Sequence, residues 1–227
     1  MVRQLLERIF TAVAQVVTAV LYPYYLVRER QGWGGQIPIL MYHQIGRPPG
    51  AARVSQDCVS PERFERQLRA LLDSGYRVIS LGQLLGLLNG PIEARRRCVA
   101  LTFDDGLRGQ FRHAYPILKR YGVPATFFLV AGYVGMKTVP PHLGLEPGQF
   151  GDRAQLAEWC PLSWEEAGEL ARNRMEIGSH SVSHRSLGCL GRETAINEVR
   201  WSKKLLEARL GVAVEFFAYP FGSHGYG

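Results

Sequence analysis

The sequence predicts an α/β fold built on a parallel sheet, which is either open and doubly wound or closed into a barrel. The main observation is that short apolar runs alternate with amphipathic helical patterns from residue 36 onward. The length of 227 residues suits a single domain with one substantial core. Apolar residues make up 46% and charged residues 21%, which is typical of a globular protein and excludes disordered, collagen-like and coiled-coil classes.

The beginning of the chain is predicted to associate with a membrane. Residues 9–27 form a run of 19 without a charged side chain, just long enough to span a bilayer. We interpret residues 1–30 as a signal-anchor or membrane-associated segment, residues 31–35 as a linker and residues 36–227 as the globular domain. An amphipathic helix lying on the membrane and a cleaved signal are the alternatives. The expected location is therefore the cell envelope, with the domain membrane-anchored or secreted.

Six strands are expected in the globular domain. Each is a short apolar run bounded by turn residues or helix caps. The third run is apolar throughout, as is typical of a strand buried on both faces. The expected strands cover residues 37–42, 76–80, 98–103, 125–130, 175–179 and 215–219.

Five helices are expected between these strands. Ser60 is the N-cap of the first helix, with Pro61 in its first turn, and Ser163 with Glu166 forms a capping box. Gly211 ends the last helix. The expected helices cover residues 61–74, 81–88, 115–121, 164–172 and 193–210, and residues 132–161, rich in Pro and Gly, are expected to form a long loop over one face.

Charge and cysteine content exclude several kinds of site. The chain has 27 Lys and Arg against 20 Asp and Glu, but the basic residues are spread along it and no nucleic-acid-binding module is recognisable. Attraction to an anionic membrane or glycan is an alternative to a solvated surface. No Cys-x-x-Cys pair occurs among the four cysteines, so neither a disulfide framework nor a structural zinc site is predicted.

Polar residues follow several of the expected strands, where sites form in parallel α/β folds. Asp104 and Asp105 follow the third strand, and His180 and His184 follow the fifth. Two aspartates alone could form a turn, and two histidines at this spacing could be coincidental. Together, two imidazoles and one carboxylate form a ligand set that leaves coordination positions open, as a catalytic zinc site requires. The pattern predicts a divalent metal site.

Three segments carry a family resemblance. They are LTFDDG at residues 101–106, GSHSVSH at residues 178–184 and FAYPFG at residues 217–222. In this order they resemble the motifs of polysaccharide deacetylases with a NodB-type domain, also called carbohydrate esterase family 4, and the resemblance covers roughly residues 36–227. It implies a deformed (β/α) barrel whose last strands would lie beyond residue 227.

The resemblance implies a role for each motif residue. Asp105, His180 and His184 would bind the metal, and Asp104 would be the general base that takes a proton from the water attacking an acetamide carbonyl. Acetate and a free amine would result. Zinc is the expected ion, although cobalt, nickel and iron also suit these ligands.

The chain departs from the family pattern in two places. Many members have Arg where this chain has Ala218, and the usual C-terminal His acid would lie beyond Gly227. However, ILMYHQIG at residues 39–46 resembles the opening of a subgroup that deacetylates exported poly-N-acetylglucosamine, in which an early His supplies the acid and the Arg is absent. His43 is therefore the expected catalytic acid, with a buried core histidine as the alternative.

The remaining expectations concern the substrate. Tyr219, Pro220 and Phe221 are expected to contact sugar rings, with core packing as the alternative role of the aromatic side chains. The expected function is removal of N-acetyl groups from an amino-sugar polysaccharide such as poly-N-acetylglucosamine, a chitin-like polymer or the peptidoglycan glycan. An O-acetyl esterase and a catalytically silent glycan-binding domain are the rival functions. His113 and His142 receive no role.

Overall fold

The computed structural model describes residues 36–50 and 57–222. The expected membrane-associated segment, residues 1–30, and the linker, residues 31–35, lie outside the described residues, so both stay predictions. Within the described ranges, every helix is too short or too polar to cross a bilayer.

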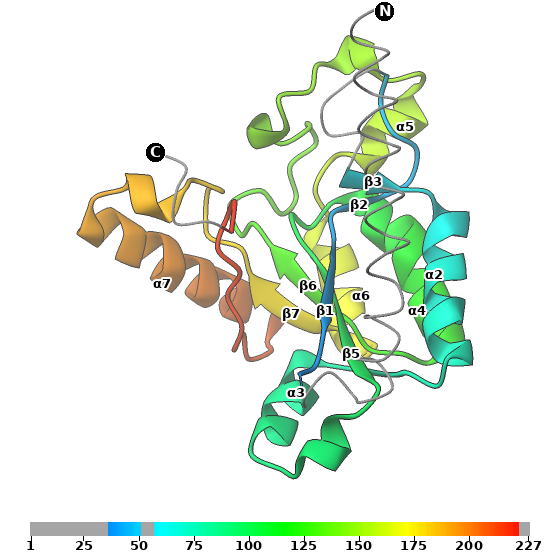
Figure 1. Ribbon diagram of the computed structural model, residues 1–227. Helices are drawn as coiled ribbons and strands as arrows, with labels where there is room; N and C mark the ends of the chain where they lie inside the picture. Colours follow the sequence, from blue (N-terminus) through cyan, green and yellow to red (C-terminus); the bar gives the residue numbers. More distant parts are fainter. Residues whose placement is uncertain (1–35, 51–56, 223–227) are drawn as a thin grey trace, which may run out of the picture.

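The centre of the domain is a five-stranded parallel sheet (Figure 1). Its strands run in the order β1-β5-β6-β7, and β4 also pairs with β5. All pairings are parallel, which confirms the predicted α/β class. The strands are β1 (Ile39–Tyr42), β4 (Arg77–Ile79), β5 (Cys98–Phe103), β6 (Thr126–Leu129) and β7 (Glu176–Ser179).

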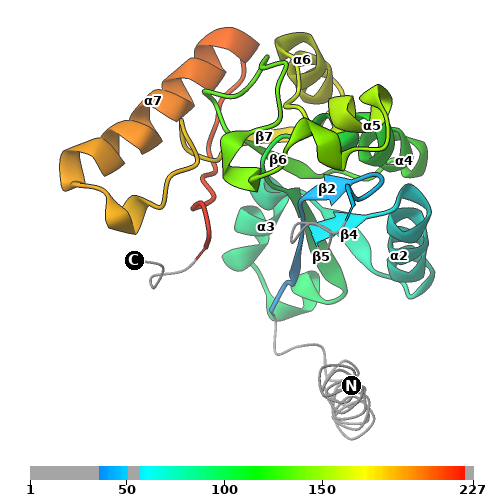
Figure 2. The same ribbon diagram turned by 90° about the horizontal axis from the view of Figure 1, so that it is seen from above.

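Helices lie around the outside of this sheet, with α7, α6, α4 and α2 following one another in Figure 2. The expected caps are present: the Ser60 side chain accepts a hydrogen bond from the Arg63 N–H, and Ser163 and Glu166 form the capping box. Gly211 ends the last helix in the left-handed conformation. The helices are α2 (Pro61–Asp73), α3 (Leu81–Leu88), α4 (Tyr115–Tyr121), α6 (Trp164–Arg172) and α7 (Arg192–Leu210).

The core forms around β5, all six residues of which are buried. The ring of Phe103 stacks on Phe127 of β6 with centroids 4.8 Å apart, and Phe64 of α2 meets Phe103 edge-on at 5.6 Å. The prediction of a central strand buried on both faces is confirmed. This rigid centre fixes the position of the residues that follow Phe103.

The expected last strand, residues 215–219, is wrong as a full strand. The segment makes one parallel bridge, between Phe217 and Ser179. The residue just before this segment, Val214, is bound to α7 and not to β7. Lys203 Nζ donates to the Val214 carbonyl, and the Val214 N–H donates to Glu207. The segment therefore reaches the sheet only at the end of β7.

The expected long loop, residues 132–161, contains a short helix that the sequence analysis missed. This helix, α5 (Arg153–Glu158), is too short to show a helical period, although Asp152 caps it by accepting a hydrogen bond from the Gln155 N–H at 2.7 Å. The segment lies beyond the carboxyl ends of the strands, and α3 lies at the opposite end of the sheet (Figure 1). Two-residue strands, β2 (Gln44–Ile45) and β3 (Cys58–Val59), were also missed.

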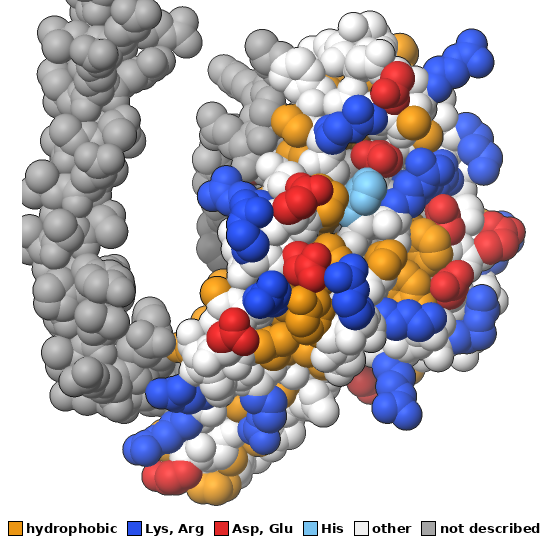
Figure 3. All heavy atoms as spheres, turned by 90° about the vertical axis from the view of Figure 1, so that its right-hand side faces the viewer, with side chains coloured by type: hydrophobic (Ala, Val, Ile, Leu, Met, Phe, Trp, Pro, Cys, Tyr) orange, Lys and Arg blue, Asp and Glu red, His pale blue; other side chains and the backbone are white. Residues whose placement is uncertain are grey.

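The surface beside α2 and α4 carries mixed charge. On the face seen in Figure 3, basic and acidic side chains are interspersed with apolar ones, so no large area of one sign forms there. Ion pairs such as Arg120–Glu65, at 3.0 Å, contribute to this mixture. The basic excess is therefore not concentrated on this face.

Candidate metal centre

Asp105, His180 and His184 come together in the folded chain. Asp105 lies two residues after β5, His180 directly follows β7, and all three side chains are buried. Each offers one ligand atom, and these atoms lie within 4.8 Å of one another. The structure therefore brings together the three residues that the sequence predicted as metal ligands.

The two imidazoles present Nε2 to Asp105. The distance to Asp105 Oδ1 is 3.2 Å from His184 Nε2 and 3.6 Å from His180 Nε2. His180 Nδ1 lies 2.9 Å from the Ala218 carbonyl, which accepts its proton and leaves Nε2 with the lone pair. Burial lowers the pKa of His180 to about 4, so the ring is neutral near pH 7, as a metal ligand must be.

Asp105 supplies the negative charge of the site. Burial opposes its ionisation, but interactions with the imidazoles of His142 and His184 outweigh burial and hold its pKa well below the usual range. Its buried Oδ1 has no hydrogen-bond partner in the part of the chain that the structure describes. An ionised, buried carboxylate oxygen without a partner fits a bound cation.

The backbone around the cluster is strained. Asp105, Ser181, His184 and Phe221 have φ between +54° and +72°, in the left-handed region that non-glycine residues rarely adopt. Each such residue costs about 1–2 kcal/mol. Strain of this kind persists where the surrounding structure enforces it, and it is concentrated at functional sites.

Glu198 of α7 enforces the conformation of the loop that carries both histidines. Its carboxylate accepts hydrogen bonds from the N–H groups of Val182 and Ser183, at 2.8 and 2.9 Å, and from the Ser183 hydroxyl at 2.6 Å. The Ser181 hydroxyl also accepts from the His184 N–H at 3.0 Å. The loop between His180 and His184 is therefore held at both its backbone and its side chains.

Asp104 lies beside the ligand cluster, and its pKa is shifted in the direction opposite to that of Asp105. Burial, followed by smaller contributions that include repulsion from Asp105, raises the pKa of Asp104 to about 6, although the charge of His43 lowers it. His43 therefore interacts electrostatically with Asp104, and its role as the acid stays a prediction. Gln110 Nε2 ties the two strand ends together, because it donates to the carbonyl of His43 at 2.7 Å and to that of Asp104.

The comparison with protein families identifies the family of this chain. The family model for polysaccharide deacetylase matches residues 92–226, which include the aspartate pair and both histidines. The chain belongs to the polysaccharide deacetylase family.

Curated proteins of this family are similar to the chain over most of its length. The putative polysaccharide deacetylase YxkH of Bacillus subtilis (strain 168) is 29% identical over 189 residues, which cover 83% of this chain and 58% of YxkH. The poly-beta-1,6-N-acetyl-D-glucosamine N-deacetylase of Staphylococcus aureus (strain MSSA476) is 25% identical over 165 residues, which cover 72% of this chain and 53% of that protein. The chain spans little more than half the length of these relatives.

A solved deacetylase shares the fold. The Streptococcus pyogenes deacetylase PplD in complex with acetate superposes with a TM-score of 0.63 at 28% identity, covering 81% of this chain and 73% of PplD. The expected (β/α) fold of the NodB type is thereby confirmed for this chain.

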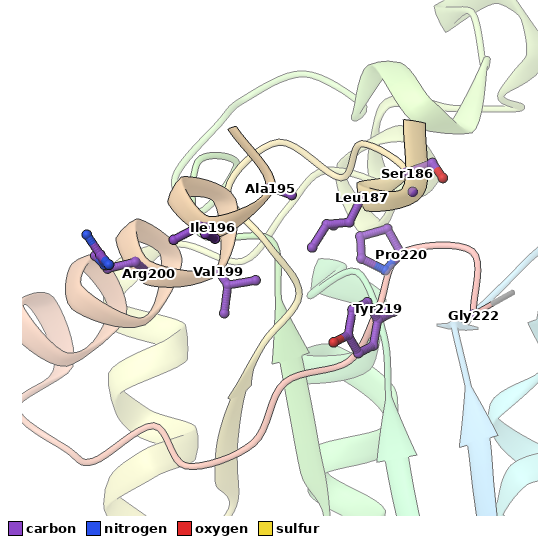
Figure 4. Close-up of a pocket in the computed structure, with 10 residues that line it drawn as sticks. Ser186, Leu187, Ala195, Ile196, Val199, Arg200, Tyr219, Pro220 and Gly222 are labelled. Atoms are coloured by element: carbon purple, nitrogen blue, oxygen red, sulfur yellow. The ribbon is translucent and has the colours of Figure 1, made fainter. Parts of the chain in front are cut away.

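The residues expected to contact the substrate lie near the cluster of Asp105, His180 and His184, and their contact with a sugar stays a prediction. Phe221 is 55% exposed and meets the His184 ring edge-on, with centroids 4.9 Å apart. Tyr219 and Pro220 line a hollow of about 810 Å³ between the end of the described chain and α7 (Figure 4). The rings of Tyr219 and Phe221 are exposed, so they do not belong to the hydrophobic core, which was the alternative role for them.

One histidine beside Asp105 and His184 was missed. His142 comes from a 3₁₀ turn, η5 (Pro141–Leu143), within the long loop, and its Nε2 lies 3.5 Å from Asp105 Oδ1. Its ring stacks on that of His184 with centroids 3.9 Å apart. It could not be found from the sequence, because it follows no expected strand and lies in none of the three family motifs.

Proposed function

We propose that this chain catalyses metal-dependent N-deacetylation of an amino-sugar polysaccharide, with poly-N-acetylglucosamine as the substrate. The observation that carries this proposal is the placement of Asp104, whose pKa is raised to about 6, directly beside the buried Asp105–His180–His184 set. The name of the Staphylococcus aureus relative supports the choice of polymer.

The ion would be held by Asp105, His180 and His184. When bound, a divalent ion of this kind supplies Lewis acidity, which polarises a carbonyl and lowers the pKa of water. Zinc is the first choice, and cobalt, nickel or iron would suit the same nitrogen and oxygen ligands.

Asp104 would act as the general base. A carboxylate with a pKa near 6 is largely ionised at pH 7, and it is still basic enough to take the proton of the water that attacks the acetamide carbon. Asp105 cannot take this role, because its pKa is held far lower. The two neighbouring aspartates therefore divide the work between proton transfer and ion binding.

His43 would supply the proton that the leaving amine requires. It lies between β1 and β2 and is half-buried. It interacts electrostatically with both Asp104 and His180. The sugar ring would lie against Phe221 and Tyr219, whose exposed aromatic faces suit stacking on a pyranose.

We also propose that the domain works in the cell envelope, attached through residues 1–30. The uncharged run of residues 9–27 supports this location, as does a polymeric substrate found outside the cytoplasm. Fractionating cells that express the chain with and without residues 1–30 tests this proposal. Recovery of both forms in the same soluble fraction would contradict it.

Acetate release tests the function. The zinc-loaded and the metal-stripped protein are incubated with oligomers of β-1,6-linked N-acetylglucosamine, with chitooligosaccharides and with acetylated xylan. We expect acetate from the N-acetylated glycans only when metal is present. Acetate from xylan alone would make the chain an O-acetyl esterase. No acetate from any glycan, with zinc still bound, would make it a silent glycan-binding domain.

A further inference from the structure

The pairing of β1 with β5 ends where the proposed acid and base begin. The two strands pair as far as Tyr42 and Phe103, and the Asp104 N–H donates to the Tyr42 carbonyl at 2.9 Å. The next carbonyls along the two strands, those of His43 and Asp104, accept from Gln110 Nε2 instead, and the distance at His43 is 2.7 Å. One side-chain amide therefore continues the connection between the strands at these two residues.

The side chain of Gln110 is fully buried, and its orientation is fixed by these two contacts. Because carbonyl oxygens only accept, the amide must turn its Nε2 toward His43 and Asp104. Its buried Oε1 is left without a hydrogen-bond partner in the part of the chain that the structure describes. An unpaired buried acceptor opposes folding, so a glutamine at this place points to a role beyond packing.

The backbone around Gln110 is shaped to deliver its side chain to the strand ends. Gln110 is the first residue of a π-helical turn, η4 (Gln110–Ala114), a wide turn that is frequent at functional sites. The preceding residue, Gly109, lies directly against β2. A Cβ at Gly109 would lie 2.5 Å from the Ile45 carbonyl oxygen and closer still to Gln44 Oε1. Only glycine therefore allows the turn to approach β2 this closely.

We propose that Gln110 is a positioning residue that fixes the separation of His43 and Asp104 for catalysis. The inference rests on the proposed function, in which these two residues transfer protons. Both must reach the same acetamide group, and a misplacement of about 1 Å can cost about 10²-fold in rate. Gln110 binds the backbone of both residues, so it would act through them and not on the substrate.

A matched pair of glutamines allows a controlled test. The test variant is Gln110→Met, which keeps a side chain of similar length but removes the donor. The control is Gln155→Met, because Gln155 is also buried and its Nε2 also donates to two backbone carbonyls, those of Arg47 at 3.3 Å and Pro48 at 2.8 Å. Zinc content, kcat and KM are measured for each zinc-loaded chain with oligomers of β-1,6-linked N-acetylglucosamine.

We expect Gln110→Met to lose about 10- to 100-fold in kcat with an unchanged KM, because misplacement impairs proton transfer and not sugar binding. Gln155→Met should keep the wild-type kcat, and both variants should keep their zinc. Equal kcat values in the two variants, or loss of zinc from Gln110→Met, would overturn the inference. Thermal unfolding checks the fold, and Gln110→Leu replaces the Met variant if that variant does not fold.

Combination with His43→Ala separates positioning from support of the fold. Without the acid there is less to position, so the loss in kcat of the double variant Gln110→Met/His43→Ala should be smaller than the product of the two single losses. A side chain that only stabilises the fold would act independently of His43, and the two losses would multiply. A combined loss equal to that product would therefore also overturn the inference.

Failure of the proposed function would give a different result. No acetate from the wild type would remove the function and this inference together, and full turnover by His43→Ala would remove the acid that Gln110 positions. Acetate release by the wild type with an undiminished kcat in Gln110→Met would leave the function and remove only the role of Gln110.

Discussion

The central feature at the scale of single residues is the contrast between two neighbouring aspartates. Burial raises the pKa of Asp104, whereas the imidazoles beside Asp105 overcome burial and lower its pKa. Opposite shifts in a pair of titratable groups separate an acid–base role from a purely electrostatic role. Two adjacent aspartates can take these different roles because their backbone conformations differ: Asp105 has φ +72°, whereas Asp104 does not have a positive φ.

Asp104 makes the stability of the metal-free protein depend on pH. Its folded pKa of about 6 lies above the unfolded value of 3.8, so its favourable contribution is present below about pH 4 and is lost as pH rises through 6. We expect Asp104→Asn to gain about 2–3 kcal/mol over the wild type between pH 4 and pH 7. Urea unfolding of both metal-free proteins at the two pH values measures this, and parallel behaviour of the two proteins would contradict it.

His43 provides a second prediction at this scale. If it is the acid, His43→Ala should lose about 10²–10⁴-fold in kcat, because proton transfer to the leaving amine is unassisted. Zinc affinity should change little, since His43 is outside the ligand cluster. Acetate release and a chelator competition, made on the same preparation, check both parts. Retained turnover in His43→Ala would return His43 to the role of a core histidine.

The grouping of Asp105, His180 and His184 could be predicted from sequence because these residues follow two strands whose apolar pattern is clear. In the sheet, β5 and β7 both pair with β6, so the residues that follow these two strands, Asp105 and His180, lie close together. His142 could not be predicted. Its position depends on the path of a Pro- and Gly-rich segment, which follows no periodic rule.

At the scale of elements, the important unit is the loop between β7 and α7. Helix α7 does not simply cover the sheet, because its Glu198 side chain holds the backbone of Val182 and Ser183. The same helix also binds the backbone of Val214, just before residues 215–219, through Lys203 and Glu207. These side-chain contacts with α7 explain why the last expected strand was reduced to one bridge, which an apolar pattern cannot reveal.

Glu198→Gln tests the support of this loop. Removing the charge weakens three hydrogen bonds, so we expect a loss of about 1–3 kcal/mol in the free energy of unfolding and zinc binding weakened by about 10-fold. Glu193→Gln, an exposed position on the same helix, is the matched control and should change stability by less than about 0.5 kcal/mol. Equal effects of the two variants would show that Glu198 does not support the metal site.

At the scale of the whole molecule, the predicted ion would connect segments that are distant in sequence. Asp105 follows the central strand, and His180 and His184 belong to the β7–α7 loop. The sequence was sufficient for the parallel sheet and its order of helices and strands, because these follow from local periodicity. It was not sufficient for α5, β2 and β3, which are too short to show a period.

Metal removal should therefore lower global stability. An ion present at 100 times its dissociation constant stabilises the folded state by about 2.7 kcal/mol. For a chain of this size that corresponds to about 5–10 °C in Tm. Thermal unfolding before and after treatment with a chelator, followed by return of zinc, measures the shift. A Tm that is the same with and without zinc would mean that no ion binds the folded chain tightly.

A comparison of the two aspartates within one assay tests their proposed division of roles most directly. Asp104→Asn and Asp105→Asn remove the same charge from adjacent positions, and zinc content and acetate release are measured for both. We expect Asp104→Asn to keep its zinc and to lose acetate release by at least about 10²-fold, whereas Asp105→Asn should lose both. Acetate release by Asp104→Asn at the wild-type rate would exclude Asp104 as the general base.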